Sequence, residues 1–389
     1  MDAGGYVENG FEPVRDAFVA NFEEQGDVGA ACCAYVDGRP VVDLWGGIAD
    51  QKSGREWTED TLALVYSTTK GVTAICAHHL AAASGVDLDA PVVKYWPEFG
   101  AAGKDEVTVR QLMSHRAGLP TLEPKLSVEA ALSWDPAVES LARQTPLWPP
   151  GTRHGYHAVT YGWLVGEVIR RVTGRSVGRY LAEEIAGPLG LDLWIGLPSS
   201  EEHRVSRLLP AGPISREALA SIPPEQLERL RAFADAGSLL MRALNPTDPP
   251  FSFNYPGLHA AELPGANGIG TARALARLYA ATIGEVDGIR ILDDATVRGA
   301  TVEQSSGRDA VLGLDTRFGS GFFLPSPFSP LMSPASFGHA GAGGSLALAD
   351  PERGVGFAYV MNQMQQGIAG DPRPAALVRA LTGAIDSLK

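Results

Sequence analysis

A serine and a lysine three residues apart, Ser67 and Lys70, could together carry out nucleophilic chemistry. They follow the short apolar run 62–66 and begin a segment in which apolar residues recur with the period of a helix. Residues three apart share a helix face, so the Lys70 amine would lie within reach of the Ser67 hydroxyl. The first turn of a helix disfavours a charged lysine, and a neutral amine can activate a serine by taking its proton. Ser67 also suits the N-cap position, so a structural role stays open.

A nucleophilic serine and its base need a third group that passes the proton on to the leaving group, and Tyr156 is the candidate. It lies in the loop 149–158, which two prolines stiffen and two glycines punctuate, directly before a predicted helix over 159–173. A constrained loop of this kind can present a tyrosine to a site. The alternative is a tyrosine that packs at a domain boundary.

The third feature is a histidine followed by small residues, in the stretch 337–345. Glycines beside a strand often mark the close approach of a ligand or of another backbone segment. A backbone N–H here and the N–H of Ser67 could stabilise the negative oxygen that forms when a carbonyl is attacked. A tight bend between strands also explains the glycines, but it gives His339 no role.

Three short motifs, in this order, resemble those of the serine β-lactamase and penicillin-binding-protein superfamily. They are Ser67-Thr68-Thr69-Lys70, Tyr156-His157-Ala158 and His339-Ala340-Gly341. The resemblance is closest to the class C β-lactamases and to the family VIII carboxylesterases that share their fold. It covers roughly residues 11–381, and the stretches 112–119 and 149–152 are also similar to segments typical of that family.

The resemblance implies a role for each motif. Ser67 would be the acylated nucleophile, Lys70 its activating partner, and Tyr156 the general base or proton relay. The backbone N–H groups of Ser67 and Ala342 would form the oxyanion hole. Which of Lys70 and Tyr156 takes the first proton stays open, because coupled groups titrate as a unit.

The substrate-binding positions implied by the resemblance depart from the β-lactamase pattern. These positions are His157, His339, Ala340 and Gly341. Ala158 stands where the second motif of β-lactamases ends in asparagine, and His339 stands where their third motif usually begins with lysine. Both changes weaken recognition of an anionic amide, because alanine cannot contact a side-chain amide and histidine is mostly neutral at pH 7. We therefore expect a carboxylesterase that cleaves small esters through an acyl-enzyme.

Other functions of the same site remain open at this point. They are a β-lactamase, including weak β-lactamase activity beside the esterase, an amide or D-peptide hydrolase, an acyltransferase, and a non-catalytic binding module of the same fold. The physiological substrate, the acyl chain length and the stereopreference are not encoded in any motif, and neither is the choice between a monomer and a homo-oligomer.

Strand signals at both ends of the chain and helix signals between them, together with the resemblance, predict an α/β (α+β) fold. It would be a β-lactamase/transpeptidase-like fold, with an antiparallel sheet flanked by N- and C-terminal helices and with an inserted helical domain. We expect residues 1–70 and 301–389 to form the α/β domain, residues 71–300 the helical domain, and the catalytic cleft to lie between them. The predicted strands are 28–36, 40–48, 318–324, 345–349 and 355–361. The predicted helices are 11–22, 109–115, 128–142, 159–173, 223–233, 271–283 and 374–388.

The composition limits the classes of molecule that the protein is expected to bind. A net charge of −13 argues against a nucleic-acid or anionic-membrane surface, since both reward Lys and Arg. Three cysteines are too few for a disulfide framework, residues 1–16 lack the pattern of an export signal, and no stretch approaches 18 uncharged apolar residues. We expect a cytoplasmic protein whose partner is a small-molecule ester.

Three further motifs could indicate other chemistry, but each lacks the context that its chemistry needs. Gly174-Arg175-Ser176-Val177-Gly178 matches the nucleophile elbow of α/β-hydrolases, but it follows a predicted helix where that motif needs a strand. The pairs His154/His157 and His78/His79 lack both the spacing and the third ligand of a zinc site. The glycines of 338–344 do not open a helix after a strand, as a dinucleotide loop would. We expect neither a metal nor another cofactor.

The walls of the substrate pocket are expected from three segments, 119–125, 244–263 and 325–336, by analogy with the fold. Aromatic residues in or beside them would favour apolar acyl or alcohol groups, or they would belong to the core. These residues are Phe251, Phe253, Tyr255, Phe328 and Phe337.

Overall fold

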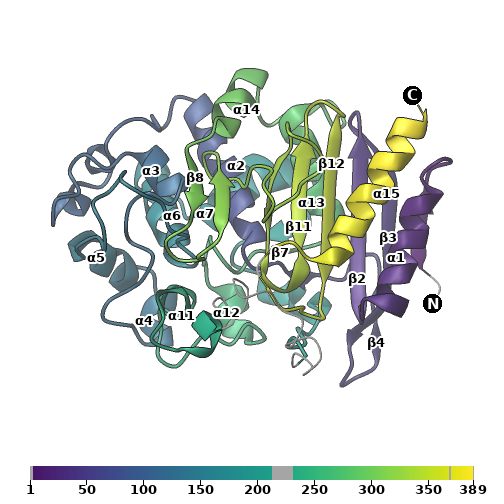
Figure 1. Cartoon of the computed structure of the whole chain (residues 1–389), viewed down its shortest axis with the longest axis horizontal. Coiled ribbons are helices and arrows are strands. Elements are labelled where there is room, and N and C mark those ends of the chain that lie inside the picture. The colour runs from purple at the N-terminus through teal and green to yellow at the C-terminus, as the bar shows by residue number, and fades with distance from the viewer. Residues whose placement is uncertain (1–2, 213–230, 368, 389) are drawn as a thin grey trace.

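The centre of the molecule is an antiparallel sheet built from both ends of the chain (Figure 1). The computed structural model describes residues 3–212, 231–367 and 369–388. The strand order is β1 (Gly4–Val7), β3 (Arg39–Asp50), β2 (Gly29–Val36), β12 (Val355–Met361), β11 (Leu346–Asp350) and β10 (Phe337–Ala340), and β4 (Arg55–Glu56) pairs with β3. Adjacent strands are antiparallel throughout. The predicted fold class is confirmed.

The hairpin between β2 and β3 follows from its turn residues. Asp37 and Gly38 have φ angles of 47° and 75°, and a two-residue turn whose twist matches that of a hairpin needs such left-handed values. At the other side of β2, β12 pairs with it from Val355 opposite Val36 to Met361 opposite Ala30. This pairing joins the two ends of the chain in one sheet.

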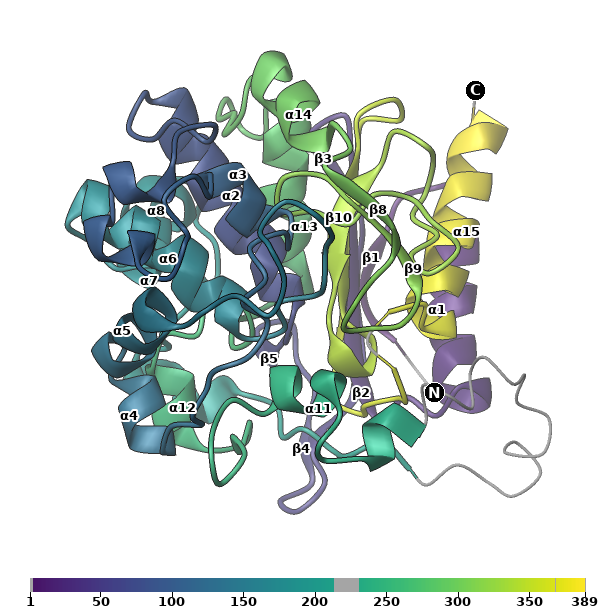
Figure 2. The same ribbon diagram turned by 60° about the vertical axis from the view of Figure 1, so that its left-hand side comes forward.

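Helices cover both faces of the sheet. α1 (Glu12–Glu24) and α15 (Pro372–Leu388) lie side by side on the outer face, as Figures 1 and 2 show. α13 (Ala272–Ile283), which Thr271 caps, packs on the inner face against β2, β11 and β12. Two-sided cover explains why β2 and β12 are almost entirely apolar and buried. α13 lies within the predicted helical segment 71–300 yet contacts the sheet, and the proposed domain division stays a prediction.

One helix, α2 (Thr68–Ala82), runs between the sheet and the remaining helices. It is buried on nearly all sides and contacts β10, β11 and α6 (Thr160–Thr173). Most of its residues are apolar and most of its polar ones are buried too, so the helix must be surrounded by protein. The few polar side chains of its first turns therefore need partners inside the molecule, and these partners make up the site described below.

The rest of the chain forms short helices and two small sheets. The helices are α3 (Val109–Met113), α4 (Val128–Leu132), α5 (Asp135–Arg143), α7 (Val177–Leu181), α8 (Gly187–Leu189), α11 (Leu239–Leu244), α12 (Pro256–Ala260) and α14 (Asp294–Thr301). One small sheet has the order β5 (Ala63–Leu64), β7 (Ile269–Gly270), β6 (Leu193–Trp194), and the other is the hairpin of β8 (Ser305–Arg308) and β9 (Asp315–Phe318). Short turns of 3₁₀ or π-helix lie at 92–94, 97–100, 182–186, 199–204 and 342–344.

Two predicted elements were wrong. The helix predicted over 128–142 is two helices, α4 and α5, because Trp134 takes a φ of 74° and its indole N–H donates to the buried Glu167. The strand predicted over 318–324 ends as β9 at Phe318, and beyond it Phe323 forms isolated bridges to Phe318 and Gly338. Of the helix predicted over 223–233, residues 223–230 lie outside the described residues.

The helices of the described residues were compared with the length and hydropathy that a membrane-spanning helix needs. Across residues 3–212, 231–367 and 369–388, none is both long enough and apolar enough to cross a bilayer. The three cysteines are buried free thiols.

Candidate active site

Ser67 stands at the junction between β5 and α2, and its hydroxyl is not used as a helix cap. The side chain makes no capping hydrogen bond although the residue occupies the N-cap position. The preceding residue, Tyr66, has a φ of 45°, which a non-glycine residue rarely adopts. This sharp bend places a partly exposed hydroxyl, which is not used in capping, at the start of a buried helix.

Lys70 lies one turn further along α2 and is completely buried. Its Nζ lies 3.0 Å from Ser67 Oγ, 2.6 Å from the carbonyl oxygen of Ala158 and 2.7 Å from that of Gly265. Burial lowers the pKa of Lys70 well below its ordinary value. A neutral amine has two N–H groups for the two carbonyl oxygens and one lone pair, which is left for the proton of Ser67.

The carbonyl of Gly265 was not predicted from the sequence. The loop that carries it is tied to α2, because Thr69 Oγ1 accepts the N–H of Gly268 at 2.7 Å and Thr73 Oγ1 donates to the Pro264 carbonyl at 2.5 Å. The signal in the sequence was a set of polar residues, Thr69, Lys70 and Thr73, in the first turns of a helix whose middle is mostly apolar. Buried polar groups on such a helix require partners.

Tyr156 lies in the loop between Gly155 and α6, and three consecutive backbone N–H groups hold this loop. The N–H of Gly155 donates to the His115 carbonyl at 3.0 Å, and that of His157 donates to His115 Nδ1 at 3.1 Å. Between them, the N–H of Tyr156 donates to Asp309 Oδ1 at 3.0 Å. The Tyr156 ring lies 4.8 Å from Lys70 Nζ, so the structure brings the serine, the lysine and the tyrosine together.

The Tyr156 side chain is uncharged at neutral pH. Burial raises the pKa of Tyr156, although a hydrogen bond to Ser67 acts in the opposite direction. Burial lowers the pKa of Lys70 and raises that of Tyr156, so the same dry surroundings favour a neutral base and a neutral acid side by side.

Asp309, on the loop between β8 and β9, is a site residue that the sequence did not predict. Its Oδ1 accepts N–H groups from Tyr156, Val311 and Leu312 at 3.0, 2.8 and 2.8 Å. Its other oxygen is buried without a hydrogen-bond partner in the described part of the chain, 3.9 Å from Nε2 of His154. No local signal could have found this contact, because 153 residues separate Asp309 from Tyr156.

His157 connects two loops. Its Nδ1 donates to the Gly155 carbonyl at 2.6 Å, and its Nε2 accepts the N–H of Leu119 at 3.0 Å. Burial lowers the pKa of His157 to about 3, which keeps it in this neutral form. Both ring nitrogens are therefore engaged within the protein, and the structure places the predicted substrate-binding residue His157 as a support of the Tyr156 loop.

The third motif lies on β10 and in the turn that follows it. A side chain on Gly341 would collide with the carbonyl of Val65, so only glycine allows this turn to reach the N-terminal end of α2. Ser345 completes the contact, because its Oγ donates to the Val65 carbonyl at 2.8 Å and lies 3.0 Å from Thr68 Oγ1. The turn containing Ala342 is thus held beside the segment containing Ser67.

The two N–H groups predicted for the oxyanion hole are available. Among the described residues, neither the N–H of Ser67 nor that of Ala342 donates a hydrogen bond within the protein. His339 and Ala340 lie on β10, the strand that precedes this turn. His339 is buried, and its Nε2 has no hydrogen-bond partner within residues 3–212, 231–367 and 369–388. Burial, reinforced by the neighbouring Lys70, lowers the pKa of His339 well below its usual range, so its ring is neutral.

Aromatic side chains lie on two sides of this cluster. Phe253 packs on Tyr66 with ring centroids 4.6 Å apart, and Phe251 lies beside Phe253. On the other side, Phe328 packs against Phe323, which contacts Tyr156. Two of the five predicted aromatics lie elsewhere: Phe337 is in the core, and Tyr255 is exposed to solvent. Residues of α11 that precede position 244 pack in the hydrophobic cluster around Tyr156. They lie outside the segments predicted as walls of the substrate pocket.

The residues of the alternative motifs have structural roles. Ser176 caps α7 by accepting the N–H of Arg179, and it donates to Glu262 at 2.5 Å. His78 contacts the Ser320 carbonyl and His79 contacts the Tyr180 hydroxyl, in separate environments. Within the ranges that the structure describes, no three His, Cys, Asp or Glu side chains gather as a metal site would require.

The fold and the site together define a class of protein. A serine and a lysine at the start of a buried helix, beside the edge strand of an antiparallel sheet that is covered by terminal helices, form the β-lactamase/transpeptidase-like architecture.

Comparison with known proteins identifies the family. The Beta-lactamase family model matches residues 14–380, and the chain belongs to this family. It is 36% identical to the esterase/beta-lactamase LipL of Mycobacterium tuberculosis (strain ATCC 25618 / H37Rv) over 93% of this chain and 84% of that protein.

Two solved structures are similar over almost the whole chain. A family VIII carboxylesterase has 39% identity and a TM-score of 0.87, with 99% of this chain and 100% of that chain covered. A penicillin-binding protein homologue from Caulobacter crescentus has 38% identity and a TM-score of 0.86, with the same coverage. The protein is therefore a hydrolase of the β-lactamase superfamily, as the motifs predicted.

Proposed function

We propose that the protein is a carboxylesterase that cleaves esters of small acyl and alcohol groups through an acyl-enzyme on Ser67. The observation that carries the proposal is the position of Lys70 Nζ, 3.0 Å from Ser67 Oγ in a buried site. The esterase names of similar proteins add support.

Acylation would begin when Lys70 takes the proton of Ser67 and the oxygen of Ser67 attacks the ester carbonyl. The N–H groups of Ser67 and Ala342 would stabilise the resulting oxyanion. Tyr156 would then donate its proton to the departing alcohol as the bond from carbon to the alcohol oxygen breaks, and the proton held by Lys70 would restore Tyr156. The lowered pKa of Lys70 and the raised pKa of Tyr156 support this order of proton transfers.

In the second half of the reaction, water would attack the acyl-enzyme. Its proton would pass to the same pair of groups, the bond between the acyl carbon and Ser67 Oγ would break, and the pair would return that proton to Ser67 Oγ as the acid is released. These steps use only protein groups and water.

The preference for esters over anionic amides rests on two positions. Ala158 contributes its backbone carbonyl to Lys70 and has no side-chain amide to offer a substrate. His339 is neutral, so it provides no permanent cation for a carboxylate. A β-lactam or D-peptide amide is the second candidate, because similar proteins are named an esterase/beta-lactamase and a penicillin-binding protein homologue.

The test is a steady-state assay on p-nitrophenyl butyrate and on nitrocefin with the wild type, Ser67→Ala and the control Ser176→Ala. We expect rapid ester cleavage and slow nitrocefin cleavage, both abolished in Ser67→Ala and retained in Ser176→Ala. Efficient nitrocefin cleavage would favour the lactamase. A wild type inactive on both substrates would refute the esterase and favour an amide hydrolase or a binding module.

A further inference from the structure

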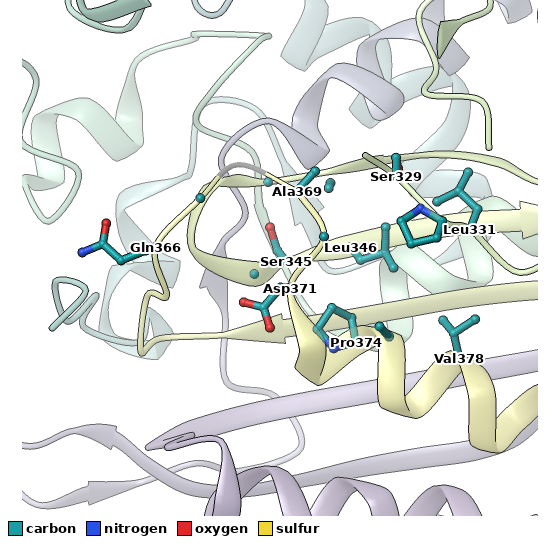
Figure 3. Close-up of a pocket in the computed structure, with 16 residues that line it drawn as sticks. Ser329, Leu331, Ser345, Leu346, Gln366, Ala369, Asp371, Pro374 and Val378 are labelled. Carbon is teal, nitrogen blue, oxygen red and sulfur yellow. The ribbon is translucent and has the colours of Figure 1, made fainter. Parts of the chain in front are cut away.

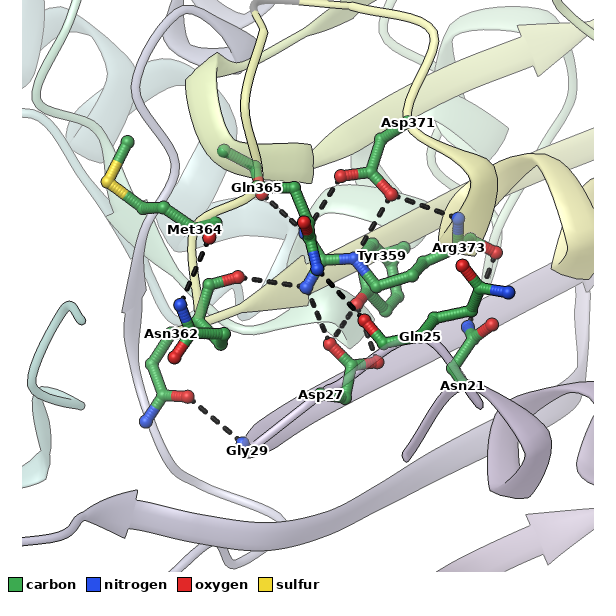
Figure 4. Close-up of polar contacts among 12 residues, drawn as sticks. Asn21, Gln25, Asp27, Gly29, Tyr359, Asn362, Met364, Gln365, Asp371 and Arg373 are labelled. Atoms are coloured by element: carbon green, nitrogen blue, oxygen red, sulfur yellow. Dashed lines mark hydrogen bonds and ion pairs between the residues drawn. The ribbon is translucent and has the colours of Figure 1, made fainter. Parts of the chain in front are cut away.

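A buried arginine lies behind the turn that carries Ala342. The side chain of Arg373, at the start of α15, has no exposed surface, and neither has the side chain of Asp27, with which it pairs at 2.8 Å. Figure 4 shows this pair with Asp371 and Tyr359. Neither Arg373 nor Asp27 belongs to any of the three motifs.

The donor groups of Arg373 contact four partners from separate segments. Nη1 donates to Asp27 Oδ1 and to the Gln363 carbonyl, both at 2.8 Å. Nη2 donates to the Gly343 carbonyl at 2.5 Å and to Asp371 Oδ2 at 2.8 Å, while Nε donates to Asp371 Oδ1 at 3.0 Å. One planar guanidinium thus fixes the turn after β10, the end of β12 and the start of α15.

Asp27 is itself held in place. The hydroxyl of Tyr359 lies 2.7 and 2.8 Å from the two carboxylate oxygens of Asp27. Tyr359 belongs to β12, the strand next to β11. A buried ion pair has a large desolvation cost and is often no more stabilising than apolar residues of the same size. The specific contacts of this pair therefore need an explanation other than stability.

Polar contacts hold the turn that Arg373 contacts. The Gly343 carbonyl also accepts the N–H of Gln365 at 3.0 Å, and the N–H of Gly343 donates to the Gly367 carbonyl at 3.3 Å, so Arg373 adds a side-chain contact to backbone hydrogen bonds. Gly343 and Gly344 have φ angles of 84° and 130°, which glycine adopts without strain but does not favour over its other conformations. Figure 3 shows a cavity beside the turn, lined by Gly344, Ser345 and Leu346 and by Val378 of α15. With a cavity on this side, side-chain packing around the turn is incomplete, and polar contacts contribute to fixing its backbone.

We propose that Arg373 is a positioning residue for the oxyanion hole: its contact with the Gly343 carbonyl orients the N–H of Ala342 toward the oxygen of the substrate carbonyl. The inference rests on the proposed function, because it assumes that Ala342 stabilises an oxyanion. Asp27 acts one step further away, since it holds the guanidinium in place.

The test is Arg373→Lys, which keeps the positive charge beside Asp27 but lacks the planar fork of donors. Losing one oxyanion donor outright costs about 100- to 1,000-fold in kcat, so a displaced donor should cost about 10- to 100-fold, with KM changed less than about threefold. The rate is expressed per Ser67 labelled by a fluorophosphonate, so that unfolded enzyme does not contribute. The affinity for phenylboronic acid, whose adduct with serine places an oxygen in the oxyanion hole, should fall by a similar factor.

A second pair of variants separates positioning from stability. Asp27→Asn should lower kcat in the same sense as Arg373→Lys. Its matched control is Glu167→Gln, because Glu167 is an equally buried carboxylate that pairs with Arg170 and Arg171 at 2.7 Å, on α6. The control should lower the melting temperature and leave kcat and boronate affinity unchanged.

The outcomes are distinct. Unchanged kcat and boronate affinity in Arg373→Lys or, if that variant does not fold, in Asp27→Asn would overturn the positioning role. An equal loss of kcat in Glu167→Gln would overturn it as well. Ester cleavage that survives Ser67→Ala would instead refute the proposed function, and the inference with it.

Discussion

Replacing Tyr156 by phenylalanine removes one hydroxyl and leaves the ring contacts of the residue in place. The ring packs near Phe318, Phe323 and His115, and phenylalanine can keep these contacts. The loop is held by backbone N–H groups, which the substitution does not touch. A lost hydrogen bond costs about 0.5–1.5 kcal/mol of stability, so the variant should fold.

The effect on catalysis should depend on the leaving group. An alkyl ester releases an alkoxide, which needs a proton, whereas p-nitrophenolate is a stable anion that leaves without one. Loss of a general acid costs about 10²- to 10⁴-fold, or about 3–5 kcal/mol, and we expect this loss for ethyl butyrate in Tyr156→Phe. The loss for p-nitrophenyl butyrate should be less than about tenfold.

The assay compares kcat/KM for the two esters, by pH-stat for ethyl butyrate and by absorbance for p-nitrophenyl butyrate. The value of kcat/KM reports only the steps up to acylation, so slow deacylation does not obscure the comparison between the two esters. Equal large losses on both esters would show that Tyr156 takes the proton of Ser67 and would refute the order proposed here. Full activity on both would remove Tyr156 from the mechanism.

Three further predictions concern Lys70, Asp309 and Ser176. Between the lowered pKa of folded Lys70 and 10.5, this residue binds fewer protons in the folded state than in the unfolded state. The free energy of unfolding of the wild type, relative to that of Lys70→Met, should therefore rise with pH. Urea unfolding of both proteins at pH 6 and pH 9 measures this difference. Asp309→Ala leaves three N–H groups without their acceptor, which should lower the free energy of unfolding by about 3 kcal/mol and lower kcat because Tyr156 loses its anchor; an unchanged kcat would contradict that anchoring role. Ser176→Ala should cost about 1 kcal/mol in thermal unfolding because it loses a helix cap, with kcat unchanged; loss of activity would instead place the nucleophile there.

The sequence by itself predicted what depends on neighbouring residues. Asp37-Gly38 specified a hairpin because both residues tolerate left-handed backbone angles. The three-residue spacing of Ser67 and Lys70 brought their side chains together because both lie on one turn of a helix. The order of the three motifs, taken with the composition, was enough to predict the fold class and the family.

Only the tertiary structure decided what surrounds those residues. The carbonyls that contact Lys70 lie 88 and 195 residues away, and a backbone carbonyl has no residue type by which a sequence could reveal it. Asp309 resembles an ordinary turn residue, and it acquires a role only because the β8–β9 hairpin folds over the Tyr156 loop. The break at Trp134 likewise depends on the distant Glu167. Long-range packing sets the protonation states, because burial rather than a neighbouring charge is the largest cause of the pKa shifts of Lys70 and Tyr156.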